Sequence, residues 1–222
     1  MQLTANEVRI LGSLVEKEAT TPDVYPLSLN ALTTACNQTS NRDPVMDLSE
    51  ELVRNAVNNL RQQSLVRAVQ HTGSRVMKFQ HLLAERLDLD TPLLAALCVL
   101  MLRGPQTPGE IRSRSGRLAS FDTVGDIDAA LAQLRSKQLV VELARRPGQK
   151  ESRWAHLLSG AAAAEAGEVE SEAPAVAFVR VPHDPRRESD ERMATLEGTV
   201  AQLRDDLERL RKEFDALRGQ LE

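Results

Sequence analysis

The chain has 222 residues and a formal net charge of −4, and 41% of its residues are hydrophobic but only 3% aromatic. A core so poor in aromatic side chains favours small helix-rich domains over a β-sandwich or barrel. The longest apolar run, residues 92–102, is much shorter than the roughly 20 residues that span a bilayer, and no cleavable leader pattern opens the sequence. We therefore expect a cytoplasmic protein that does not enter a membrane.

The first 87 residues predict three helices. A capping box, T-A-N-E, begins at Thr4 and starts the first helix, and a short second helix begins near Ser28. A third helix is expected to begin near Asp47, where D-L-S-E is another capping box. The apolar residues that this third helix is expected to bury are Leu48, Leu52, Val53, Ala56, Val57 and Leu60.

Residues 88–158 repeat the same order of helices. Thr91-Pro92 is expected to cap the first of them, with proline at the first helical position. T-P-G-E at Thr107 is a capping box for a short second helix, and Asp122 or Thr123 starts a third. The apolar residues that this third helix is expected to bury are Val124, Ile127, Leu131 and Leu134.

Each set of helices is followed by two runs with strand character, 65–70 with 75–83 and 139–144 with 153–158. A turn or loop containing glycine separates the runs of each pair, which is typical of a β-hairpin. An internal echo marks the junction of the third helix and the hairpin, where LRQQSLV (60–66) corresponds to LRSKQLV (134–140).

Three helices and a β-hairpin are the winged-helix arrangement. The predicted fold is therefore mainly α with small β-hairpins (α+β). We expect one winged-helix domain at residues 1–87 and a second at 88–158, followed by a disordered linker at 159–191 and a coiled-coil helix at 192–222.

The stretch LSLNALTTACNQTSNRDPVM (27–46) contains an unusual concentration of amides and hydroxyls before Asp43-Pro44. In one interpretation, these side chains satisfy unpaired backbone groups of a tight connection between helices. In the other, they form a polar patch that contacts a phosphate or a partner. The candidate residues are Asn37, Gln38, Asn41 and Arg42.

Two stretches of the sequence, YPLSLNALTTACNQTSNRDPVMDLSEE (25–51) and TPGEIRSRSGRLASFDT (107–123), resemble the YceH-like family of uncharacterised bacterial proteins. The resemblance covers about residues 3–158, and ACNQ-x-x-NR-x-PVM is its most specific signature. It implies a tandem winged-helix fold and a bacterial cytoplasmic setting. It implies no activity and no site residues.

The C-terminal 31 residues carry an uninterrupted heptad pattern with apolar residues spaced alternately three and four apart. In a parallel dimer, residues that face each other across the seam, such as Arg192 and Glu197, have opposite charges. We therefore predict a parallel homodimer; the alternative is a single amphipathic helix folded back on its own chain. The predicted oligomerisation residues are Met193, Leu196, Val200, Leu203, Leu207, Leu210, Phe214, Leu217 and Leu221.

The sequence contains no constellation typical of an enzyme, cofactor site or metal site. Its four histidines are scattered, and none has a metal-ligand spacing to Cys36 or Cys98. The two cysteines are expected to be reduced thiols in the core. We therefore expect a protein that is not an enzyme and that binds no cofactor.

DNA binding is the function most often associated with winged helices, whose third helix enters the major groove. The third helix of residues 1–87 offers Arg54, Asn55 and Asn58 as base-reading groups. The competing class is a protein-interaction scaffold without DNA binding, since fold does not fix function. We favour a dimeric DNA-binding regulator, in which the second domain would contact phosphates through Arg112, Arg114, Arg117, Arg145, Arg146 and Lys150.

Overall fold

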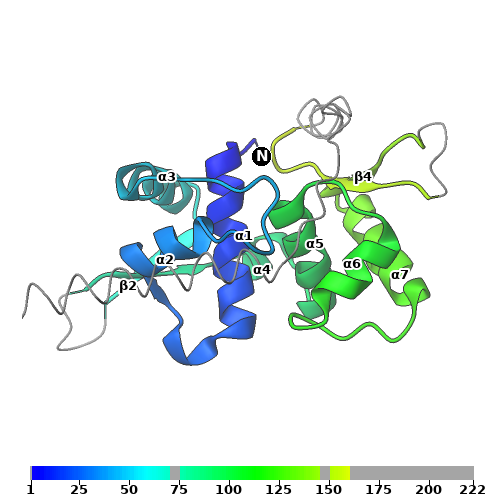
Figure 1. Cartoon of the computed structure of the whole chain (residues 1–222), viewed down its shortest axis with the longest axis horizontal. Helices are drawn as coiled ribbons and strands as arrows, with labels where there is room; N and C mark the ends of the chain where they lie inside the picture. The colour runs from blue at the N-terminus through cyan, green and yellow to red at the C-terminus, as the bar shows by residue number, and fades with distance from the viewer. Residues whose placement is uncertain (1, 71–75, 146–150, 161–222) are drawn as a thin grey trace, which may run out of the picture. The chain divides into compact units, whose positions relative to one another are not determined.

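A computed structural model of the chain describes residues 2–70, 76–145 and 151–160, and these residues are mainly helical with two small antiparallel sheets (Figure 1). We call residues 1–87 the first segment and residues 88–158 the second. The first segment contains α1 (Ala5–Thr20), a 3-10 turn (Pro22–Val24), β1 (Leu27–Ser28), α2 (Leu29–Cys36), α3 (Glu50–Gln62), β2 (Val66–Val69), β3 (Lys78–His81) and α4 (Leu83–Leu87). The second contains α5 (Thr91–Arg103), α6 (Pro108–Ser115), α7 (Val124–Ser136), β4 (Val140–Glu142) and β5 (Trp154–His156).

Most helix starts follow from local capping. The predicted capping boxes at Thr4 and Thr107 are both present, and a third forms at Thr123, where Asp126 returns the bond. Two predicted starts were wrong. The N-cap of α3 is Ser49, two residues after Asp47, because its hydroxyl accepts the backbone N–H of Leu52 at 3.3 Å.

The second wrong start is that of α5, whose N-cap lies one residue earlier than expected. The carboxylate of Asp90 accepts the N–H of Leu93 at 3.0 Å, so Thr91 is the first helical residue and Pro92 the second. A carboxylate is also favoured at this end of a helix by the helix dipole. The short helix α4, which directly follows β3, had no counterpart in the sequence prediction.

Both segments contain an antiparallel hairpin after their third helix, with a further short strand or bridge beside it. In the first sheet β3 lies between β1 and β2, with Leu27 opposite Phe79. In the second sheet β4 pairs with β5, and an isolated bridge joins Gln106 to Trp154. Gln106 precedes α6 just as β1 precedes α2, so the two segments share this pairing as well.

The internal sequence echo corresponds to a repeated backbone geometry. Ser64 and Gln138, the fifth residue of each echo, both have φ of 58°, a left-handed conformation that ends the preceding helix. The next residue then returns its N–H to the helix, from Leu65 to Leu60 at 2.9 Å and from Leu139 to Leu134 at 3.0 Å. The repeat therefore specifies the same exit from helix into strand.

Most buried apolar residues of both segments form one cluster that runs from Leu3 to Leu158, and Leu143 and Ala155 form a second, small cluster in the β4–β5 hairpin. Within it α1 packs against both α3 and α5 (Figure 1). Cys36 and Cys98 are buried free thiols, as predicted. Two helix residues expected in this core are instead exposed, because each lies in the first turn of its helix: Leu52 at 47% and Val124 at 43%.

Several predictions concern residues that the structure does not describe. The two hairpin tips, most of the linker and the whole coiled coil lie outside the described residues, as do Arg146 and Lys150. The predicted division between segments falls between α4 and α5. In the part of the chain that is described, no helix has the length and apolar character needed to cross a bilayer.

The α1–α5 contact depends on a glycine. A Cβ atom on Gly12 would lie 2.8 Å from Cδ2 and 2.9 Å from Cγ of Leu102 on α5. The absence of a side chain therefore allows the two helices to approach closely. Gly109 in α6 is the matched comparison, because a Cβ atom there would meet nothing within 4 Å.

We predict that Gly12→Ala lowers the free energy of unfolding by about 1–3 kcal/mol relative to Gly109→Ala, since extra atoms in a packed contact force neighbours to move. Both changes gain helix propensity, so their difference isolates the steric cost. Urea unfolding followed by circular dichroism measures it. Equal stability of the two variants would show that the contact adjusts freely.

Candidate nucleic-acid interface

The outward face of α3 carries the predicted base-reading residues. Arg54, Asn55 and Asn58 are all exposed, while Val53, Ala56, Val57 and Leu60 face the core. Arg54 pairs with Glu50 at 2.7 Å, and Asn58 accepts a long hydrogen bond from Arg61 at 3.4 Å. The side-chain amide of Asn55 forms no hydrogen bond with another residue in the described ranges. This face therefore presents amide and guanidinium groups that α3 does not need for packing.

The corresponding face of α7 has different chemistry. Aligning Leu60 with Leu134 places an apolar residue at each buried position of both helices. At the outward positions, Asp128, Ala129 and Ala132 of α7 stand where α3 has Arg54, Asn55 and Asn58. The two helices therefore have similar buried residues but different outward residues. At these positions only α3 offers groups that pair bidentately with bases.

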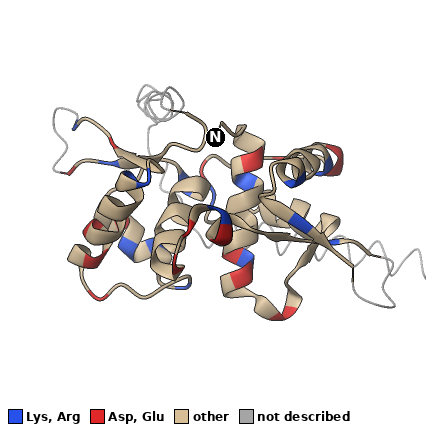
Figure 2. Ribbon diagram, turned by 180° about the vertical axis from the view of Figure 1, so that it is seen from behind, with Lys and Arg blue, Asp and Glu red and all other residues tan. Residues whose placement is uncertain are grey.

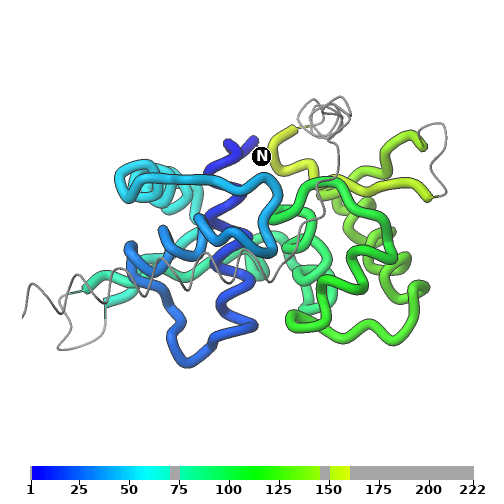
Figure 3. The backbone as a smooth tube through the Cα atoms, viewed as in Figure 1, coloured from blue at the N-terminus to red at the C-terminus, as the bar shows by residue number. Residues whose placement is uncertain are grey.

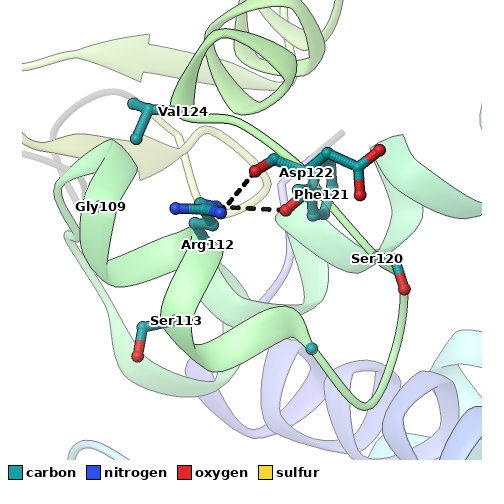
Figure 4. Close-up of a pocket in the computed structure, with 8 residues that line it drawn as sticks. Gly109, Arg112, Ser113, Ser120, Phe121, Asp122 and Val124 are labelled. Atoms are coloured by element: carbon teal, nitrogen blue, oxygen red, sulfur yellow. Dashed lines mark hydrogen bonds between the residues drawn. The ribbon is translucent and has the colours of Figure 1, made fainter.

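The predicted phosphate-contacting arginines of the second segment occupy different environments. Arg112 reaches from α6 across to the loop before α7, where its guanidinium donates to the carbonyls of Phe121, at 3.2 Å, and Asp122 (Figure 4). Arg114 lies 3.6 Å from Glu110, one turn earlier on α6. Arg117 and Arg145 are exposed. Arg112 therefore fixes a loop, whereas Arg117 has its charge in solvent.

An open groove of about 660 Å³ runs beside Arg112 between α6 and the loop that leads into α7 (Figure 4). Its walls include Gly109, Ser113, Ser120 and Val124.

Basic and acidic residues are interspersed along the helices of both segments (Figure 2). Positive or negative charge on these helices is therefore confined to small groups of neighbouring residues.

The polar stretch between α2 and α3 is held from inside the protein. The amide of Asn37 brackets the backbone of Leu48, donating to its carbonyl at 2.9 Å and accepting its N–H at 2.8 Å. Arg42 is only 5% exposed; its guanidinium donates to the carbonyl of Ala35 and to the side chain of Gln38. These contacts favour the structural interpretation of the stretch over the contact patch.

Arg42 also forms a buried ion pair with Glu16 of α1, at 3.2 and 2.6 Å from its two carboxylate oxygens. A second buried cation, Arg9, donates to the carbonyls of Cys36, at 3.1 Å, and Pro44. Burial, and then the nearby Arg42, lower the pKa of Arg9. The end of α2 would otherwise leave the carbonyl of Cys36 unpaired, so α1 supplies its donor.

Sequence reasoning missed Arg9 and Glu16. Both lie in α1 between apolar residues, and neither belongs to a motif. The only signal in the sequence is that each charged residue directly adjoins a core residue of the same helix: Arg9 is next to Ile10, and Glu16 is next to Val15. Which loop they hold depends on the tertiary structure, because their partners are about 26 to 35 residues away.

The same connection also contacts the second segment, toward which it runs in Figure 3. The N–H of Asp43 donates to the carbonyl of Leu102 at 2.9 Å, and Arg103 donates to the side-chain oxygen of Asn41. Asn41 has φ of 60°, a left-handed conformation that asparagine tolerates. The polar stretch is therefore a joint between α1, α2 and α5.

The two described histidines differ in their partners, because the Nδ1 atom of His156 is buried without a hydrogen-bond partner among the described residues. His81 is buried; its Nδ1 accepts the N–H of Leu83, so its Nε2 donates to Glu18 at 2.8 Å. Burial lowers the pKa of His156 to about 4, and raises the pKa of Cys36 to about 11. Among the described residues, no three His, Cys, Asp or Glu side chains gather as a metal site requires.

We predict that Arg42→Ala lowers the free energy of unfolding by about 3–5 kcal/mol, because it leaves the Glu16 carboxylate buried without its partner. Arg54→Ala is the matched control: its ion pair with Glu50 is exposed and should contribute less than about 1 kcal/mol. Chemical denaturation near neutral pH compares the two. A loss no larger for Arg42→Ala than for the control would contradict the structural role of the pair.

Comparison with known proteins places the chain in a family. The model of a family described as "Protein of unknown function, DUF480" matches residues 3–149. A UPF0502 protein from Shewanella sp. (strain MR-4) is 43% identical over 217 residues, covering 95% of this chain and 98% of the relative.

Other relatives agree. A UPF0502 protein from Pelobacter propionicus is 45% identical, with 100% of this chain and 99% of the relative covered. One from Opitutus terrae is 48% identical over 78% of this chain and 77% of the relative. These matches confirm the resemblance to an uncharacterised bacterial family. The chain belongs to the DUF480 family.

Proposed function

We propose that this protein is a tandem winged-helix regulator that binds DNA in the bacterial cytoplasm, with α3 as the helix that enters the major groove. The support for the fold is the repeated order of three helices, a hairpin and a short third strand or bridge. In winged-helix proteins the third helix carries the base-reading groups.

The observation that carries the proposal is the outward face of α3. Arg54, Asn55 and Asn58 are exposed there, and arginine and asparagine are the residues that pair bidentately with guanine and adenine. The matched positions of α7 are Asp128, Ala129 and Ala132, which have no such capacity and carry one negative charge. A packing role does not account for this difference, because both faces point to solvent.

The second segment would then contribute phosphate contacts instead of base contacts. Arg117 is exposed beside α6, and Arg145 follows β4 at the start of the hairpin tip. Phosphate contacts fix the register of a protein on DNA without reading sequence. The competing proposal is a protein-interaction scaffold, which the intermixed charges of the helices and exposed apolar side chains such as Leu52 and Val124 would suit.

The proposal includes a homodimer formed by a parallel coiled coil at residues 192–222. Its support is the heptad pattern of the sequence, since these residues lie outside the described ranges. A dimer would present two copies of α3 to DNA, as two half-sites require.

We predict that the full chain binds mixed-sequence duplex DNA and that the triple variant Arg54→Ala, Asn55→Ala, Asn58→Ala weakens binding at least tenfold. Each bidentate base contact discriminates against the wrong base by about 1–3 kcal/mol, so the loss is expected on fragments that contain the preferred bases. The affinity of the wild type should also fall steeply as salt rises, because cations are released from the phosphates. Fluorescence anisotropy of labelled genomic fragments measures both effects.

The control for this experiment is Gln133→Ala, which removes an exposed amide from α7 and should leave DNA affinity unchanged. Circular dichroism confirms that both variants fold. Absence of wild-type binding even at low salt would reject DNA binding and favour the scaffold. Equal binding by the wild type and the triple variant would reject α3 as the reading helix.

We predict that the full chain sediments as a dimer at micromolar concentration and that a chain ending at Ser159 sediments as a monomer. The apolar seam supplies the association energy, so its removal should abolish the dimer. Analytical ultracentrifugation of the two chains makes the comparison. A monomeric full chain would show that the terminal helix does not form an intermolecular coiled coil.

A further inference from the structure

A small cavity of about 40 Å³ lies at the polar joint, where α1, α5, α6 and the connection between α2 and α3 come together. Three arginines line it: Arg103 at the end of α5, Arg114 on α6, and Arg117 just after α6. Asn41 and Glu16 also line it, and the rest of the wall is mostly apolar. Cations therefore predominate at a site that also belongs to the joint.

The one carboxylate of the cavity wall is already neutralised. Both oxygens of Glu16 accept from the buried Arg42, at 3.2 and 2.6 Å. Glu16 is therefore already shared with Arg42, and one carboxylate balances only part of the charge of the three arginines. Burial, Arg114 and then Arg42 lower the pKa of Arg103, and these effects outweigh the nearby carboxylates of Asp43 and Glu16, which raise it.

The three arginines have little compensation elsewhere. Arg103 donates to the neutral side-chain oxygen of Asn41, which holds the guanidinium at the cavity. Arg114 lies 3.6 Å from Glu110, a carboxylate that is also 3.6 Å from Arg153 and returns a bond to the N-cap of α6. Arg117 is exposed and makes no hydrogen bond or ion pair with the described residues. Like charges held together in this way favour an anion between them.

The size of the cavity limits which anion fits. A water molecule needs about 10–15 Å³ in the same measure, so the cavity holds about three. That is the scale of a single oxyanion and not of a nucleotide base or a peptide. Arginine forks match the oxygens of phosphate in a bidentate manner.

We propose that this cavity binds one tetrahedral oxyanion, either inorganic phosphate or the phosphate group of a small molecule, between Arg103, Arg114 and Arg117. Because the cavity lies at the joint between the two segments, the anion would link α5 and α6 to the connection that precedes α3. Occupancy would therefore brace the two segments against each other. This site is separate from the α3 face, although it shares Arg117 with the phosphate contacts of the proposed function.

The test is isothermal titration calorimetry of inorganic phosphate into the full chain at constant ionic strength, with chloride as the reference anion. We expect a single saturable site in the millimolar range or tighter. Arg117→Gln should weaken it at least tenfold, because the variant loses one charge-assisted contact to the anion. Since Arg117 has no partner within the described residues, its replacement should leave the fold intact.

Two further variants sharpen the result. The double variant Arg103→Gln, Arg117→Gln should abolish saturable binding, whereas Arg135→Gln on α7, an arginine whose side chain is 65% exposed, should leave it unchanged. The triple α3 variant should also bind phosphate normally. Circular dichroism verifies that each variant folds.

Three outcomes would overturn the proposal. One is the absence of saturable heat with inorganic phosphate. Another is binding that Arg117→Gln and the double variant leave unaltered, since the anion would then be held elsewhere. The third is dependence of duplex DNA binding on Arg103, Arg114 and Arg117 without any binding of inorganic phosphate, which would assign these arginines to the nucleic-acid backbone.

Discussion

The buried ion pair between Glu16 and Arg42 is the interaction on which the arrangement of the described helices depends. It ties α1 to the connection between α2 and α3, and the same connection reaches α5 through Asp43 and Asn41. A buried pair contributes modestly by itself, but the loss of one partner leaves a charge stranded in the core. The pair therefore makes the position of this connection specific, because an alternative path for the chain would separate the two charges.

The joint also explains why α3 can present a polar face that does no packing. Its buried positions are filled as in α7, and its start is set by Ser49 directly after the segment that Asn37 and Arg42 hold. The outward residues of α3 and α7 have consequently diverged without disturbing the core. The repeated framework therefore carries a polar outward face on α3 and an acidic and apolar outward face on α7.

Packing around Gly12 complements this polar contact on the same side of α1, one helical turn before Glu16. There the helix approaches α5 so closely that a Cβ atom would lie within 3 Å of Leu102, whose carbonyl also accepts the N–H of Asp43. The apolar contact and the polar joint thus meet at the same turn of α5. The cluster of Arg103, Arg114 and Arg117 lies next to this meeting point, so a ligand bound there would act on both.

Local signals in the sequence determined most of the helices, the two hairpins and the repeat. Capping at Thr4, Thr107 and Thr123 depends on residues three apart, and the left-handed exits at Ser64 and Gln138 depend on a seven-residue echo. The tertiary structure decided the roles of Arg9, Glu16 and Arg42, the exposure of Leu52 and Val124, and the gathering of three arginines beside Asn41. The physical reason is range: a cap or a turn is fixed by bonds within a few residues, whereas a buried charge or a cavity is defined by partners that only folding brings together.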